Sequence, residues 1–285
     1  MTRKVVGRSD GRTVGGIAES TRLLTARPPE RQTAVDWYLI VDPVGRSGAE
    51  NMAIDYSLLR NAQQGVAFLR LYRWMPPCLS FGRNEPARTR YDTDAIARLG
   101  LDTVRRPTGG RAVWHDREVT YAVAGPTNMF GSLREAYIRI HGVLAAALRR
   151  LGVPAELAPH PRTRAITPDG GACFASPAGG EIVVGGLKLV GSAQVREASA
   201  LLQHGSILVE NGQDVVARIT RGRRRSPAAT SLTAALRRSV SLEEVSDAIV
   251  AEARQYWKGA WQDGMACCTA DAIARFQDPA WTWRR

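Results

Sequence analysis

The order of strand-like and helix-like segments constrains the fold of this 285-residue chain more than any other feature. Short β-rich runs alternate with glycine and proline turns over residues 67–126, and two more, EIVVGGLKLVGSAQVRE and SALLQHGSILVE, follow in the second half. Segments with helical periodicity lie between them. Strands joined by tight turns pair antiparallel, and helices between strands cover the faces of a sheet. The sequence therefore predicts an α/β domain of the mixed (α+β) kind, with a largely antiparallel sheet core flanked by helices.

Two N-capping patterns predict where the longer helices begin. The S-x-x-E sequences at 132–135 and 241–244 match the capping box, in which a serine and a glutamate each satisfy a backbone amide of the other. After the first, apolar residues at spacings of three and four indicate a helix that Gly152 ends; the stripe consists of Leu133, Tyr137, Ile140, Leu144, Ala147 and Leu151. The second pattern predicts a helix through about Trp257, so the C-terminal portion is expected to be helical.

A further helix is predicted over residues 49–64, and it carries Asn51 and Asp55 beside its apolar stripe. Residues four apart lie on one face of a helix. We interpret this pair as buried hydrogen-bonding residues of an N-terminal cap network. His141 lies beside the stripe of the helix from residue 132, and we interpret it as a hydrogen-bonded histidine at the edge of the core.

The first part of the chain differs in composition from the rest. Residues 1–32 are rich in Arg, Gly, Ser, Thr and Pro without a lasting apolar period, which predicts a mobile N-terminal extension. Residues 33–285 are expected to form a single domain. The N-terminus lacks the apolar core of a secretory signal, and no run reaches the roughly 20 apolar residues that cross a bilayer. We therefore expect a cytoplasmic protein with no membrane partner.

The basic residues are almost all arginine. The chain has 39 Lys and Arg residues and a formal charge of +12, yet its only lysines are Lys4, Lys188 and Lys258. A basic surface attracts acidic partners over long distances, and nucleic acid and acyl carrier proteins are the candidates. Because lysine is so rare here, a lysine within a β-rich run suggests a task that arginine cannot perform, such as losing its proton when desolvated.

The cysteines and histidines do not indicate a metal site. The four cysteines show no Cys-x-x-Cys spacing, and the four histidines are scattered, so no zinc pattern emerges. One of the cysteines, Cys173, lies in a Pro/Gly-rich loop just before the run that contains Lys188. A nearby ammonium lowers the pKa of a thiol and increases its thiolate fraction. The two residues together suggest a nucleophile, whereas each alone is compatible with a buried structural cysteine or an exposed strand lysine.

Two glycine-containing segments add groups that bind an anion or a carbonyl oxygen. In RRPTGGRAVWH (105–115), Gly109 and Gly110 let backbone amides approach a ligand, and arginines add positive charge. An ordinary hairpin turn is the alternative interpretation of this segment. In GGLKLVGSAQ (185–194), the small residues 191–193 are typical of the floor of a tight pocket.

These motifs together resemble the lipoate/biotin protein ligase and octanoyltransferase superfamily from about Asp36 to the C-terminus. Arg-Arg-x-x-Gly-Gly-Arg-Ala-Val-x-His is matched by residues 105–115, and a Cys-Phe pair before a proline loop is matched by 173–174. Gly-x-Lys-x-x-Gly-Ser-Ala-Gln is matched by 186–194, and Gln-His-Gly-Ser-Ile-Leu by 203–208. Within the superfamily, the chain is most similar to the cysteine-dependent octanoyltransferases that resemble lipoate ligase.

The resemblance implies a biotin/lipoate ligase (class II synthetase-like) catalytic domain with acyltransferase activity. Octanoyl would pass from octanoyl-acyl carrier protein, through a thioester on Cys173, to a lysine of a lipoyl carrier domain, as lipoate biosynthesis requires. The expected acceptors are lipoyl domains of 2-oxoacid dehydrogenases or the carrier protein of glycine cleavage. Thioester exchange is nearly isoenergetic and amide formation is downhill, so the resemblance implies no ATP, no other cofactor and no metal.

The site residues follow from the same resemblance. Cys173 and Lys188 are the expected catalytic residues, and the lysine would polarise the carbonyl, hold the thiolate or deprotonate the amine. Backbone amides at 109–110 or 191–193 would stabilise the oxyanion. The expected wall of the acyl tunnel consists of Trp74, Leu79 and Val113. The expected substrate-binding residues are Arg73, Trp74, Arg106, Gly109, Gly110, Arg111, His115, Gly191, Ser192, Ala193, His204 and Gly205.

Three alternative functions stay open at the level of sequence. An ATP-dependent lipoate ligase shares the fold, but ligases usually carry Gly-Gly-Gly where residues 109–111 read Gly-Gly-Arg, and they need no cysteine at 173. An amidotransferase that moves octanoyl between two carrier domains is chemically closer. A basic nucleic-acid-binding protein ranks lowest, because only the net charge and the RGRRR sequence at 221–225 support it.

Overall fold

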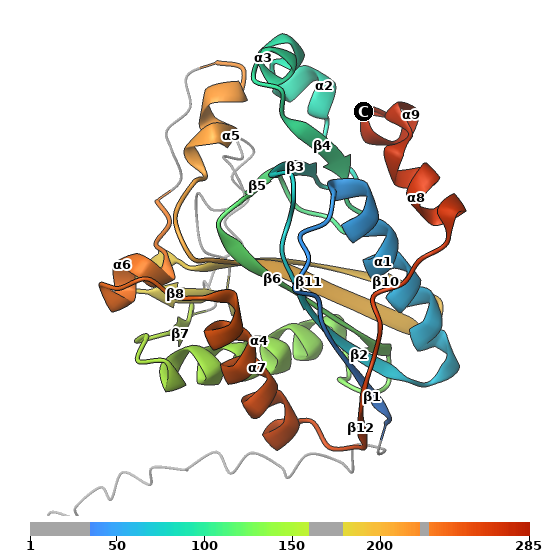
Figure 1. Cartoon of the computed structure of the whole chain (residues 1–285), viewed down its shortest axis with the longest axis vertical. Coiled ribbons are helices and arrows are strands. Elements are labelled where there is room, and N and C mark those ends of the chain that lie inside the picture. The colour runs from blue at the N-terminus through green and yellow to red at the C-terminus, as the bar shows by residue number, and fades with distance from the viewer. Residues whose placement is uncertain (1–34, 160–178, 223–227) are drawn as a thin grey trace, which may run out of the picture. The chain divides into compact units, whose positions relative to one another are not determined.

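The computed structural model of the chain describes residues 35–159, 179–222 and 228–285. Cys173 and the extension predicted over residues 1–32 lie outside these ranges, as does most of the RGRRR sequence. In the described part, a central sheet carries helices on both faces (Figure 1). This arrangement confirms the predicted fold class.

The main sheet has six strands in the order β10-β11-β6-β2-β1-β12. The pairs β10–β11, β11–β6 and β6–β2 are antiparallel, whereas β1 runs parallel to both β2 and β12. The largely antiparallel core was predicted, and the parallel edge was not. The strands are β1 (Trp37–Val41), β2 (Ala67–Tyr72), β6 (Glu118–Pro126), β10 (Val190–Glu197), β11 (Ala200–Leu208) and β12 (Trp261–Asp263).

Two small three-stranded sheets accompany the main sheet. The first has the order β4-β3-β5 and lies beside the main sheet at the end where β6 begins; its strands are β3 (Cys78–Phe81), β4 (Asp102–Arg105) and β5 (Val113–His115). The second has the order β7-β8-β9, with β7 (Glu156–Leu157), β8 (Ile182–Val184) and β9 (Leu187–Lys188). Gly185 and Gly186 join β8 to β9 with φ values of 56° and 77°, which glycine adopts without a steric penalty. The predicted hairpin turn is therefore confirmed.

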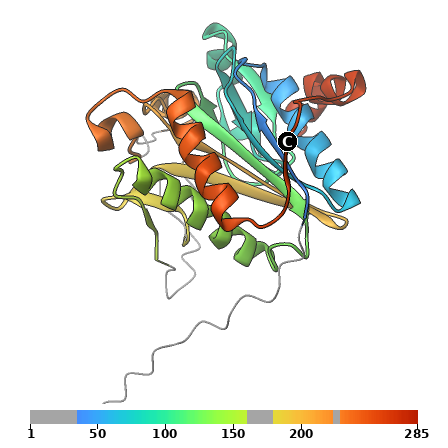
Figure 2. The same cartoon turned by 60° about the horizontal axis from the view of Figure 1, so that its bottom comes forward.

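Helices α1 (Gly48–Asn61) and α8 (Ala270–Gln277) pack together on one side of the main sheet, and α4 (Leu133–Arg150) and α7 (Leu242–Tyr256) on the other (Figure 2). A 3-10 turn, η1 (Ala62–Gln64), continues α1, and Gly65 then ends the helix as predicted. The short helices are α2 (Ala87–Arg90), α3 (Thr93–Arg98), α5 (Asp214–Ile219), α6 (Leu232–Leu236) and α9 (Pro279–Thr282).

Strand periodicity divides the core into two layers. On β6, Val119, Tyr121 and Val123 pack under α4 and α7, whereas Ala122 and Ala124 pack under α1. The small alanines let α1 approach the sheet closely. Every second residue of β6, counted from Ala122, therefore points to the α1 face, as do the residues paired with them on adjacent strands. This face holds the pocket described below.

Most predicted helix boundaries are confirmed, with three local corrections. Ser132 and Glu135 form the complete capping box of α4, but Leu133 is 39% exposed and does not join the buried stripe. Ser241 caps α7 alone, because the Glu244 carboxylate binds Arg238 instead of the Ser241 amide.

The third correction concerns α1. Its cap consists of Ser47 and Glu50, which form a complete capping box that the sequence analysis missed. The prediction that Asn51 and Asp55 belong to the cap is wrong. Both are buried, as expected, but they bind Arg70 of β2. No helix in the described ranges is both long and apolar enough to span a bilayer.

Candidate active site

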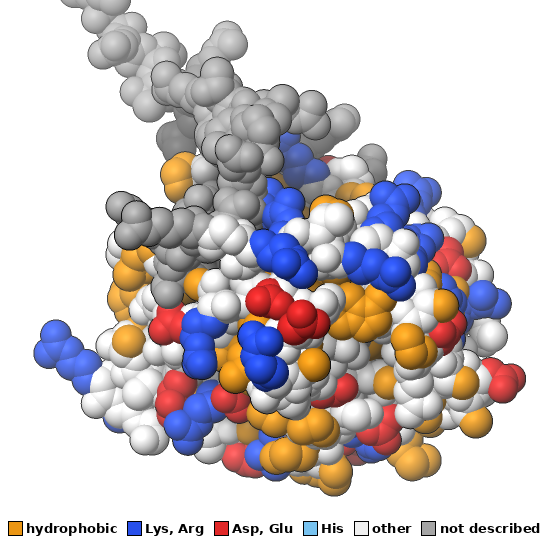
Figure 3. Space-filling view, turned by 90° about the horizontal axis from the view of Figure 1, so that it is seen from above, with side chains coloured by type: hydrophobic (Ala, Val, Ile, Leu, Met, Phe, Trp, Pro, Cys, Tyr) orange, Lys and Arg blue, Asp and Glu red, His pale blue; other side chains and the backbone are white. Residues whose placement is uncertain are grey.

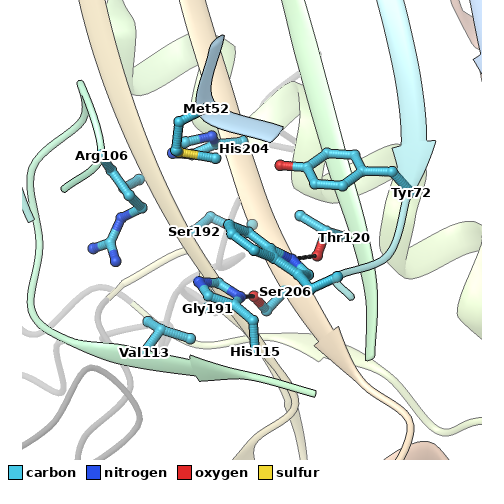
Figure 4. Close-up of a pocket in the computed structure, with 13 residues that line it drawn as sticks. Met52, Tyr72, Arg106, Val113, His115, Thr120, Gly191, Ser192, His204 and Ser206 are labelled. Carbon is cyan, nitrogen blue, oxygen red and sulfur yellow. Dashed lines mark hydrogen bonds between the residues drawn. The ribbon is translucent and has the colours of Figure 1, made fainter. Parts of the chain in front are cut away.

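A narrow pocket opens on the α1 face, between the main sheet and the β4-β3-β5 sheet (Figure 4). Residues from α1 and β2, the β5 strand, β6, β10 and β11 converge on it from positions up to 154 residues apart, counted from Met52 to Ser206. Its lining is mostly apolar, aromatic or glycine: Met52, Tyr72, Trp74, Arg106, Val113, His115, Thr120, Gly191, Ser192, Ala193, His204, Gly205 and Ser206.

The Glu118 carboxylate organises one wall of the pocket. Its Oε1 atom accepts hydrogen bonds from Thr120 Oγ1 at 2.5 Å and from Ser206 Oγ at 2.8 Å, and it lies 2.7 Å from His115 Nδ1. Trp74 Nε1 donates to Thr120 Oγ1 at 2.8 Å, and the indole stacks on the His115 ring at a centroid distance of 4.0 Å. Trp74 and His115 therefore form one rigid wall.

The protonation of His115 follows from its surroundings. Burial lowers its pKa, although Glu118 acts in the opposite direction, so the ring is neutral at pH 7. A neutral ring with a carboxylate at Nδ1 carries its proton there. Its Nε2 atom then accepts from Ser80 Oγ, which lies 2.5 Å away.

Arg106 connects the pocket to the predicted Gly-Gly-Arg segment. Its Nη1 atom donates to Ser80 O at 2.8 Å, and its Nη2 atom donates to Gly109 O at 3.1 Å and Arg111 O at 2.8 Å. These bonds fold the loop 107–111 against β3. A side chain at Gly82 would lie 1.9 Å from Gly110 O, which shows how closely the two backbones approach.

His204 is fixed by a buried charge network on the opposite wall. Its Nδ1 atom lies 2.8 Å from Asp55 Oδ2, and its Nε2 atom lies 2.7 Å from Thr108 Oγ1. Asp55 also accepts from Tyr72 Oη at 2.8 Å and from Arg70 Nη1 at 2.9 Å. Desolvation raises the pKa of Asp55, but its hydrogen bonds and charged partners outweigh this effect and keep the pKa lowered, so the carboxylate is ionised.

A second polar cluster lies behind β10, on the side that α4 covers. Ser192 Oγ is 2.7 Å from Tyr121 Oη and 2.8 Å from His141 Nε2, and His141 Nδ1 is 2.7 Å from Gly180 O. Because a carbonyl only accepts, Nδ1 carries the His141 proton and Nε2 accepts from Ser192. The expected role of His141, a satisfied histidine, is confirmed by these two bonds, although the ring is fully buried.

Lys188 belongs to the same side of the molecule. It is 1% exposed, and its Nζ atom donates to Glu181 Oε1 at 2.7 Å. The positive charge of Lys188 contributes to the lowered pKa of His141, after the larger effect of burial. The alternative of an exposed strand lysine is therefore wrong.

The structure brings most of the predicted binding residues together. Eight of them line the pocket: Trp74, Arg106, His115, Gly191, Ser192, Ala193, His204 and Gly205. Gly109, Gly110 and Arg111 line an adjacent hollow instead. Arg73 is exposed and donates to Pro43 O at 2.6 Å, away from the pocket. Of the predicted tunnel wall, Val113 is present, but Leu79 packs with Phe81 and Trp114 in a separate core.

Four pocket residues were not among the predicted binding residues: Met52, Tyr72, Thr120 and Ser206. Strand periodicity contained a usable signal for two of them. Thr120 and Ser206 are paired across β6 and β11, and two hydroxyl side chains that face each other on neighbouring buried strands indicate a hydrogen-bonding role. Within the described ranges, no three His, Cys, Asp or Glu side chains are grouped so that they could hold a metal ion.

The fold places the chain in the structural class of lipoate-protein ligases. A crystal structure of lipoate-protein ligase A bound with ATP superposes with a TM-score of 0.69 over 88% of this chain and 98% of that one, at 19% identity. A bipartite lipoate protein ligase from Thermoplasma acidophilum superposes with a TM-score of 0.68 over 87% of this chain and 96% of that one, also at 19% identity. At such identities the likeness concerns the fold alone.

The sequence defines the family. Residues 47–254 match the lipoyl protein ligase A/B catalytic domain, so the chain belongs to this family. Similar proteins named Octanoyltransferase LipM include one from Symbiobacterium thermophilum, 38% identical over 76% of this chain and 84% of that protein. Those from Carboxydothermus hydrogenoformans and Kyrpidia tusciae are 38% and 45% identical, over 65% and 61% of this chain and 70% and 66% of their own lengths.

Proposed function

We propose that this protein is an octanoyltransferase that forms an amide between an octanoyl group and a lysine of a lipoyl domain. Its family membership and its similarity to proteins named octanoyltransferase support the proposal. The observation that carries it is the character of the pocket. Trp74, Met52 and Val113 supply an apolar wall, and a largely apolar pocket matches an alkyl chain better than a nucleotide.

The proposed donor is octanoyl-acyl carrier protein, and the proposed nucleophile is Cys173. The thiolate attacks the carbonyl carbon of the donor, a new C–S bond forms, and the carrier leaves as a thiol after taking up one proton. The acceptor amine then attacks the enzyme thioester, an amide bond forms, the C–S bond breaks, and the amine loses one proton. Covalent catalysis lets two large carrier proteins bind one after the other.

Lys188 is the proposed partner of the nucleophile. Its burial and its ion pair with Glu181 favour a fixed position, and the Gly191–Ala193 floor of the pocket begins three residues further along the chain. An ammonium in this position would polarise the thioester carbonyl, hold the thiolate or assist deprotonation of the amine. The pocket residues Arg106, His115 and His204 are proposed to contact the substrate, with no metal or cofactor.

The physiological setting follows from the same chemistry. The proposed acceptors are lipoyl domains of 2-oxoacid dehydrogenases or the carrier protein of glycine cleavage, because these domains present the lysine that lipoylation modifies. We place the reaction in the cytoplasm and assign it to a single catalytic domain over residues 33–285, preceded by an N-terminal extension.

The dependence on ATP tests the proposed function. Purified protein, octanoyl-acyl carrier protein and a lipoyl domain without nucleotide should yield a lipoyl domain heavier by one octanoyl group. Octanoate with ATP should not replace the carrier thioester, and Cys173→Ala should be inactive. Strict dependence on octanoate and ATP, with an active Cys173→Ala variant, would identify an ATP-dependent ligase instead.

A further inference from the structure

Arginine side chains gather on one face of the molecule, formed by residues 82–90, the loop 107–111 and residues 281–285. Figure 3 looks onto this face and shows several basic side chains on it, with acidic side chains between some of them. The acidic residue within the first segment, Glu85, is buried and bonded to Tyr91 Oη at 2.5 Å. The exposed or partly exposed basic residues of this arginine face are Arg83, Arg88, Arg90, Arg111, Arg284 and Arg285.

Specific bonds hold these like charges close together. Arg284 Nη2 donates to Arg83 O at 2.6 Å, and the Arg88 amide donates to Arg285 O at 3.0 Å. The Arg284 guanidinium lies 4.4 Å above the Trp281 ring. Burial, followed by the positive charges of Arg83 and Arg285, lowers the pKa of Arg284. These contacts hold mutually repelling positive charges close together, and the surface that they form is therefore strongly positive.

The arginine face shares a wall with the pocket. The Arg83 amide donates to Thr108 O at 2.7 Å, which ties segment 82–90 to the loop 107–111. A side chain at Gly110 would lie 3.9 Å from the Cβ atom of Ala193, which lines the pocket. On the outer side of the loop, an open hollow is lined by Asn84, Glu85, Pro86, Arg90, Gly109, Gly110 and Arg111.

We propose that the arginine face is the docking surface for the acidic carrier protein that delivers the acyl thioester, an inference that rests on the proposed function. A carrier with a cluster of Asp and Glu side chains complements this face electrostatically, and such complementarity increases the association rate. The acyl arm of a carrier docked here would pass over the loop 107–111 into the pocket. The Lys188–Glu181 pair lies on the other side of β10, which leaves that side for the acceptor.

Charge reversal tests the proposal without removing a known side-chain bond. The bonds that join Arg88 to Arg285 involve backbone atoms, so Arg88→Glu/Arg285→Glu changes charge alone. Arg60 and Arg139 are exposed on α1 and α4, away from this face, and Arg60→Glu/Arg139→Glu is the control with the same change in net charge. The readout is the formation of octanoyl-enzyme from octanoyl-acyl carrier protein at low salt, with octanoyl-pantetheine as a small uncharged donor.

We expect kcat/KM for the carrier donor to fall about tenfold or more in Arg88→Glu/Arg285→Glu. The value with octanoyl-pantetheine, and transfer from preformed octanoyl-enzyme to a lipoyl domain, should not change. An equal loss in the control pair or with octanoyl-pantetheine would overturn the proposal. A loss confined to transfer would also overturn it, because the face would then bind the acceptor.

A binding measurement separates this inference from the proposed function. Fluorescence anisotropy of labelled acyl carrier protein should show salt-sensitive binding to the wild-type protein and to the control pair, and weaker binding to Arg88→Glu/Arg285→Glu. If the wild type forms no octanoyl-enzyme from either donor, the proposed function fails while the docking surface is still tested. Equal binding of the carrier by all three proteins, with loss of duplex DNA binding in the variant, would assign the face to nucleic acid instead.

Discussion

Buried polar residues around the pocket and in the cluster behind β10 are paired by charge or by hydrogen bonds, and burial strongly affects their protonation. His141 illustrates the rule, because its ring is fully enclosed and both nitrogens are bonded. Burial lowers its pKa from 6.5 to about 4, and Lys188 adds to the effect. A group of this kind couples folding to pH, since the unfolded chain binds the proton more readily than the folded one.

His141 should therefore make the protein less stable in mild acid. Its contribution is fully present above pH 6.5 and is lost as the pH falls toward 4, because only the unfolded state takes up the proton in that window. The loss amounts to about 3 kcal/mol at most. Urea unfolding at pH 7.5 and pH 5 should show a smaller loss for His141→Gln than for the wild type. Equal losses would contradict the assignment; His115, whose pKa is also lowered, contributes with the same sign in both proteins.

Variants of the buried ion pair between Lys188 and Glu181 distinguish a structural role of Lys188 from a catalytic one. Lys188→Met alone leaves a buried carboxylate without its ammonium partner, and we expect a loss of about 3–5 kcal/mol in unfolding free energy. Adding Glu181→Gln removes that charge and should restore much of the stability. Octanoyl transfer should stay reduced at least about 100-fold in both variants, as measured by mass spectrometry of the lipoyl domain. A stable and active double variant would show that Lys188 is only structural.

At the scale of elements, the hairpin of β10 and β11 forms the floor of the pocket. Gly205 of β11 faces Ser192 of β10, and a Cβ atom there would lie 2.4 Å from Ser192 Oγ and 2.5 Å from Gly191 O. The close approach of the two strands thus explains why the predicted pocket floor consists of small residues. A side chain at 205 cannot be accommodated unless the two strands move apart.

Gly205→Ala should lower the free energy of unfolding by about 1–3 kcal/mol and reduce transfer, because overpacking shifts the strands that form the pocket floor. Gly142 of α4 is the matched control, since nothing lies within 4 Å of a Cβ atom there. Gly142→Ala should stabilise the protein by about 0.5–1 kcal/mol through helix propensity. Thermal unfolding and transfer rates check both variants. A neutral Gly205→Ala would show that the hairpin has more freedom than these distances allow.

The elements that could be predicted from sequence are those fixed by local signals. The capping box at 132–135, the glycine turn at 185–186 and the strand periods depend on neighbouring residues, and the structure follows them. The networks that place His204 beside Asp55, or Trp74 against Thr120, join residues 149 and 46 positions apart. No local pattern specifies such pairs. Eight predicted pocket residues were identified because the motifs resemble a family. Arg73 and Leu79 lie near the pocket residue Trp74 in sequence, but they do not line the pocket.

At the scale of the whole molecule, the two faces of the main sheet have different roles in the proposed reaction. The α1 face holds an apolar pocket and continues into a positively charged surface, whereas the α4 face carries the buried Lys188–Glu181 pair and the His141–Ser192 contact. β10 at the edge of the sheet separates them. An acyl group that enters from the first side and an amine that arrives from the second would meet at this edge.

The central claim is that a cysteine of this chain carries the acyl group between the two carriers. Intact-protein mass spectrometry after brief incubation with octanoyl-acyl carrier protein, without ATP and without acceptor, tests it most directly. The account predicts a mass increase of one octanoyl group, located on Cys173, removed by hydroxylamine and absent from Cys173→Ala. A protein that stays unmodified in this assay, yet produces octanoylated lipoyl domain when the acceptor is added without ATP, would contradict the account.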